Sequence, residues 1–156
     1  MRVFDAATLS LLLATPLAAG CSSSAPVSSA PENFAGPPLA SMPSRAGEYE
    51  VAIRTSPAVP SQGEQSVEYT ITDSASGQPA SGLSLAVVPW MPAMGHGTSV
   101  VPAVAETSQG VYVATPVDWF MPGQWVLRTT ITAADAGLDG DGGVAGDYVE
   151  PSFEIP

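Results

Sequence analysis

The 156-residue sequence contains no lysine, a single histidine and a single cysteine. Fifteen acidic side chains stand against four arginines, so the formal net charge is −11. Nucleic acids and bare anionic membrane surfaces bind basic patches, and we therefore expect neither as a partner. One cysteine excludes a disulfide framework within the chain and a metal site built from several thiolates.

Helical periodicity is absent after residue 21, and 16 prolines argue against long helices. Apolar and polar residues alternate instead. The segment 47–53 (GEYEVAI) places Tyr49, Val51 and Ile53 on one side, and 66–72 (SVEYTIT) repeats this pattern. Five further strands are predicted at 83–89, 101–106, 111–115, 124–132 and 152–155. Seven short strands bounded by turn residues favour an all-β fold, a single immunoglobulin-like antiparallel β-sandwich.

Residues 1–20 have the layout of a secretory signal, with Arg2, an apolar run and then small residues before Cys21. The run from Leu17 to Cys21 (LAAGC) resembles the bacterial lipobox, which implies that the Cys21 sulfur carries a lipid after cleavage. The resemblance implies a protein anchored to a membrane of the cell envelope. Ser22 implies the outer membrane if the host has two membranes. An ordinary cleaved signal with an incidental cysteine is the alternative.

The segment that follows the signal, residues 21–45, consists mainly of serine, alanine, proline and glycine. Such a composition buries too little apolar surface to offset the entropy lost on ordering. We expect residues 21–45 to be a flexible linker behind the lipidated cysteine. The folded domain is then predicted to span residues 46–156, a length that suits one small domain.

The stretch WMPAMGHG, residues 90–97, gathers Met91, Met94 and the only histidine, His96. Thioether and imidazole are donors that suit Cu(I), and methionine is the sulfur ligand that survives in an oxidising compartment. Met94 and His96 are two residues apart, hence on one face of an extended segment. Met121 in a second loop is a candidate fourth ligand if the two loops meet at one end of the sandwich.

Packing is the alternative interpretation of the same stretch, and the residues leave both open. Methionines beside tryptophans are common core fillers, and a histidine between glycines can stabilise a turn. In the second loop, Trp125 and Leu127 alternate on a predicted strand and are expected in the core, and Asp118 is expected in a loop.

Several spaced motifs resemble the YtkA-like/FixH-like domain family. They are a turn with Asp73, Gly77 and Pro79, then MPAMGHG at 91–97, GVY at 110–112 and FMPGQWVL at 120–127. The resemblance covers about residues 47–135. It implies a small β-sandwich in a secreted or membrane-anchored protein, with copper as the expected cofactor. It also implies a protein partner in copper transfer or in the assembly of an oxidase.

Catalysis finds no support in the sequence, because no motif brings His96 together with an orienting acid and an activated serine. We therefore expect no enzymatic activity. The sequence favours a surface-anchored domain that binds Cu(I) for copper handling or delivery. A β-sandwich without metal, which has a structural role or binds a protein as an accessory to a membrane complex, is the alternative.

Overall fold

The computed structural model describes residues 32–133 and 146–156. The predicted signal and Cys21 lie outside these ranges. Within them, no helix is long and apolar enough to cross a membrane. The strands are β1 (Ala40–Pro43), β2 (Tyr49–Ser56), β3 (Gly63–Asp73), β4 (Ser84–Met91), β5 (His96–Gly97), β6 (Ala103–Ser108), β7 (Val111–Trp119), β8 (Gly123–Thr132), β9 (Asp147–Val149) and β10 (Ser152–Ile155).

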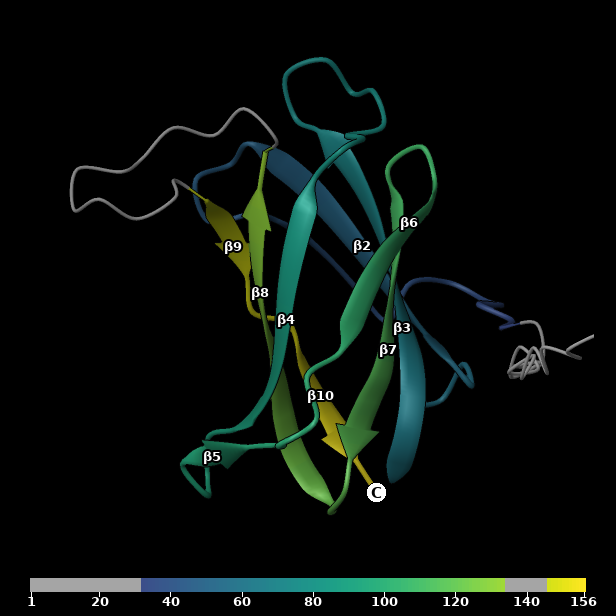
Figure 1. Ribbon diagram of the computed structural model, residues 1–156, viewed down its shortest axis with the longest axis vertical. Coiled ribbons are helices and arrows are strands. Elements are labelled where there is room, and N and C mark those ends of the chain that lie inside the picture. Colours follow the sequence, from purple (N-terminus) through teal and green to yellow (C-terminus); the bar gives the residue numbers. More distant parts are fainter. Residues whose placement is uncertain (1–31, 134–145) are drawn as a thin grey trace, which may run out of the picture.

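Two antiparallel sheets pack face to face (Figure 1). The first has the strand order β1-β2-β3-β7-β6, and the second has the order β10-β8-β4-β5, with β9 also paired to β8. The β7–β8 turn crosses from one sheet to the other, and β5 lies at the same end of the molecule as this turn (Figure 1). This arrangement confirms the predicted immunoglobulin-like β-sandwich.

The core lies between the sheets and follows the alternation of the sequence. In β2, Tyr49 and Val51 are buried while Glu50 between them is exposed. In β8, Trp125 and Leu127 have no exposed surface, as predicted. At about 25 cal/mol per Å² of apolar area removed from water, these large side chains dominate the stabilisation of the sandwich.

Two differences from the sequence analysis concern where the folded part begins and where β7 ends. Residues 40–43 form β1 within the predicted linker, because backbone hydrogen bonds to β2 need no hydrophobic pattern. The strand β7 continues beyond residue 115 to Trp119, so the half-buried Asp118 lies in a strand and not in a loop. A register shift opposite Pro116 lets the strand continue past a residue that has no N–H to donate.

Candidate metal site

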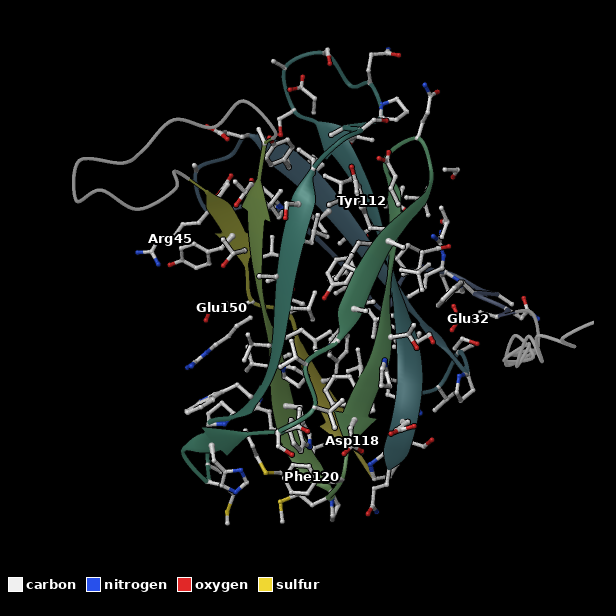
Figure 2. The ribbon with its side chains drawn as sticks, viewed as in Figure 1. Glu32, Arg45, Tyr112, Asp118, Phe120 and Glu150 are labelled. Atoms are coloured by element: carbon white, nitrogen blue, oxygen red, sulfur yellow. The ribbon has the colours of Figure 1, made fainter. Side chains whose placement is uncertain are left out.

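Two turns meet at one end of the sandwich. One connects β4 to β5 and the other connects β7 to β8. Together, residues 91–97 and 119–123 are named the tip. The imidazole of His96 in the first turn stacks on the ring of Phe120 in the second, with centroids 5.9 Å apart and an interplanar angle of 18°. Figure 2 shows Phe120 at this end, with yellow sulfur atoms around it. The condition set by the sequence analysis, that the two loops meet, is therefore fulfilled.

The β4–β5 turn is tight because one carbonyl closes it. The oxygen of Met91 accepts hydrogen bonds from the backbone N–H of Met94 at 3.2 Å and of Gly95 at 3.0 Å. Gly95 adopts a φ of 68°, a left-handed conformation that glycine enters without steric cost. The chain then reverses into β5, where His96 pairs directly with Met91.

The β7–β8 turn is fixed by a tryptophan. The indole N–H of the buried Trp125 donates to the carbonyl oxygen of Met121 at 3.0 Å. Gly123 follows with a φ of 122°, and a Cβ at this position would lie only 2.9 Å from the Cε of Met91. The side chain of Met91 therefore reaches from the first turn to the second.

The imidazole of His96 is exposed, and its Nδ1 lies 3.2 Å from the carbonyl oxygen of Gly97. A carbonyl can only accept, so the contact is a hydrogen bond in the tautomer that carries the proton on Nδ1. The lone pair of the neutral ring then stands on Nε2. Histidines that bind metals in proteins commonly donate their second ring N–H in this way.

The three methionines of the tip occupy different environments. Met91 is 4% exposed and belongs to the hydrophobic core, so the packing interpretation applies to it. Met94 is 56% exposed, which excludes a role as a core filler. Met121 is half-buried and packs against the core from the second turn. Hence Met94, His96 and Met121 present donors near the surface, and Met91 lies beneath them.

The tryptophans near the tip are not open to a bound cation. The guanidinium of Arg128 already lies 4.3 Å from the ring centroid of Trp90 and also faces Glu150. Trp119 is completely buried and forms an edge-to-face pair with Trp125. The part that Phe120 plays was not predicted from the sequence. The available signal was an aromatic residue directly between Trp119 and the Met-Pro-Gly turn.

The part of the chain that the structure describes offers no comparable set of ligands for hard metal ions. Among residues 32–133 and 146–156, no group of three or more His, Cys, Asp or Glu side chains could hold a metal ion. The donors that the tip offers are thioether and imidazole, which fit a soft monovalent ion better than Ca²⁺ or Mg²⁺.

The fold places the chain in the class of small two-sheet β-sandwich domains. The YtkA-like family matches residues 44–130, more than half of the chain. The chain belongs to the YtkA-like family, as its motifs indicated. No curated protein matches it significantly.

Solved structures with a similar fold include a copper-bound variant of FetP from uropathogenic Escherichia coli. It is 14% identical, with a TM-score of 0.47 over 76% of this chain and 90% of that chain. A copper-bound variant of Campylobacter jejuni P19 is 12% identical, with a TM-score of 0.47 over 78% of this chain and 98% of that one. These similarities are distant, and the metal bound by those proteins is no argument for a ligand here.

Proposed function

We propose that the tip binds Cu(I) through Met94, His96 and Met121, and that the protein handles or delivers copper in the cell envelope. The observation that carries this proposal is the stacking of His96 on Phe120, the neighbour of Met121. This contact joins the turn that holds one thioether and the imidazole to the turn that holds another thioether.

The chemistry of the donors supports Cu(I) over other ions. Thioether sulfur is soft and neutral, and it does not oxidise to a disulfide as a thiolate does outside the cytoplasm. Cu(II) prefers nitrogen and oxygen donors, of which the tip offers one imidazole and a few carbonyls. An exposed set of few ligands also suits a metal that is passed on to another protein.

The proposed function also includes a lipid anchor at Cys21. The acyl chains on Cys21 would hold the domain at the envelope, and the Ser/Ala/Pro-rich segment behind it would let the tip reach a partner. Exchange of Cys21 for serine is expected to move the protein from the membrane fraction to the soluble fraction of the host. Continued membrane association of Cys21→Ser would contradict the anchor.

A second function, the binding of a protein without any metal, is favoured by the exposed apolar side chains of the tip. Phe120 is 44% exposed and Met94 is 56% exposed, and both belong to the tip. The two functions differ in what His96 does, since an imidazole is required for the metal but not for an apolar contact.

The test is a Cu(I) titration of the purified protein against a competing chelator, with single variants. We expect His96→Ala, Met94→Leu and Met121→Leu each to weaken Cu(I) binding by more than about ten-fold. Met42→Leu is the matched control, because Met42 is half-buried in β1, away from the tip strands. Equal affinity in all four variants would exclude the metal site and leave the protein-binding function.

A further inference from the structure

We infer that Phe120 is a positioning residue for the metal ligand His96, a role that rests on the proposed function. Phe120 has no donor atom and does not itself bind the ion. Its ring forms a side-chain contact between the two turns of the tip and is parallel to the imidazole within 18°.

Phe120 is itself held by the core. Its ring and that of Trp125 form an edge-to-face pair at a centroid distance of 5.2 Å and an angle of 81°. Trp125 is fully buried, forms a second edge-to-face pair with Trp119, and donates its N–H to the backbone of Met121. Aromatic edge-to-face pairs favour this geometry because the positive ring edge faces the negative ring face. A chain of rings therefore connects the rigid core to an exposed imidazole.

His96 needs such support because its own strand is short. The strand β5 has two residues and lies at the edge of its sheet, paired only with β4. An exposed side chain on such a strand would otherwise sample several rotamers. The stack on Phe120 and the Nδ1 contact to Gly97 restrict the ring from two sides.

The stack also sets the direction of the coordinating lone pair. The Nε2 lone pair lies in the plane of the imidazole, and this plane is nearly parallel to the Phe120 ring. The lone pair therefore points along the surface of Phe120 and not into it. A bound ion would therefore lie in the plane of the imidazole and not between the two rings. Preorganising ligands on two separate turns lowers the entropy lost on binding, which is how Phe120 raises the affinity.

The experiment compares Phe120→Leu, Phe120→Tyr and His96→Ala with the unaltered protein. Leucine keeps apolar volume but removes the flat ring, whereas tyrosine keeps the ring. Phe120→Leu is expected to bind Cu(I) about three- to ten-fold more weakly than the unaltered protein. Phe120→Tyr is expected to retain the affinity of the unaltered protein. Val101→Ala is the control, because Val101 is 83% exposed and the change replaces one apolar surface residue by another.

A second readout separates positioning from stability. Nitrogen chemical shifts of the imidazole in the metal-free protein report which ring nitrogen carries the proton. We expect the Nδ1-protonated form in the unaltered protein and in Phe120→Tyr, and a mixture of tautomers in Phe120→Leu at an unchanged melting temperature. Unaltered affinity and tautomer in Phe120→Leu, with weak binding in His96→Ala, would overturn the inference but not the proposed function. Unaltered affinity in His96→Ala would overturn both the inference and the proposed function.

Discussion

Within four residues of the chain, two methionines have opposite environments. Met91 ends β4 with its side chain in the core, and Met94 lies in the turn with most of its surface in water. The residue type therefore does not predict the role of a methionine. The position of the methionine relative to the last hydrogen-bonded pair of the hairpin determines whether its side chain is buried. A sequence shows two methionines near a histidine, but it does not show which one the sandwich buries.

Substitutions at Met91 and Met94 are expected to act on different quantities. Met91→Ala removes a buried side chain and is expected to lower the free energy of unfolding by about 2–5 kcal/mol. Met94→Leu keeps an exposed side chain of similar size and is expected to leave stability within about 0.5 kcal/mol while Cu(I) affinity falls. Urea unfolding of both variants measures the free energy of unfolding. Equal stability of the two would contradict the burial of Met91.

At the scale of elements, the strands with clear alternation were predictable, including the four-residue β10, and the strands β1, β5 and β9 were not. The predicted strands at 47–53 and 124–132 correspond to β2 and β8, because each has several inward-facing apolar residues. The strands β1, β5 and β9 have two to four residues each, and such short segments show no period. Their pairing depends on backbone hydrogen bonds to a neighbour, which the sequence does not encode locally.

The candidate site was predictable only in part for the same reason. Its residues could be selected by donor chemistry, and Met94, His96 and Met121 follow from that. The contact of His96 with Phe120 depends on a two-residue strand and on a turn between sheets. Neither the burial of Met91 nor the ring stack could be deduced without the pairing of β4 with β5.

Gly97 offers a test of whether β5 holds the tip together. A Cβ on Gly97 would lie 2.4 Å from the carbonyl oxygen of Pro89, a backbone atom that cannot move without shifting β4. Gly97→Ala is therefore expected to break the β4–β5 pairing and to weaken Cu(I) binding. Hydrogen exchange of the backbone amides at the tip measures the pairing.

Gly95→Ala is the control for this substitution. It meets no atom within 4 Å, but its φ of 68° costs about 1 kcal/mol for a residue with a Cβ. We expect it to retain the pairing, with a small loss of stability. Fast amide exchange at the tip together with full affinity in Gly97→Ala would show that β5 is dispensable.

At the scale of the whole molecule, an excess of carboxylates is partly used to tie loops to strands. Glu106 accepts hydrogen bonds from the backbone N–H of Gly82 at 3.0 Å and of Gly110 at 3.1 Å. These bonds hold the pKa of Glu106 below its usual value of 4.5. Bonds from the hydroxyl and the N–H of Ser76 lower the pKa of Asp73 below 3.8 in the same manner.

The pH dependence of stability follows from the direction of these two pKa shifts. A carboxyl group whose pKa is lower in the folded state contributes stability above its unfolded pKa and loses it as the pH falls through the folded pKa. We therefore expect the urea midpoint to be constant down to about pH 5 and to fall below it. Glu106→Gln should have a lower midpoint at pH 7 and a shallower fall. Parallel curves for the two proteins would contradict the role of Glu106.

The central claim is that a soft ion sits between sulfur and imidazole donors at the tip. X-ray absorption spectroscopy at the copper edge of the protein loaded with one equivalent of Cu(I) tests it most directly. The account predicts a first shell of two sulfur scatterers and one nitrogen, with the nitrogen and its ring scattering lost in His96→Ala. A shell of nitrogen and oxygen alone, or one that His96→Ala leaves unchanged, would contradict it.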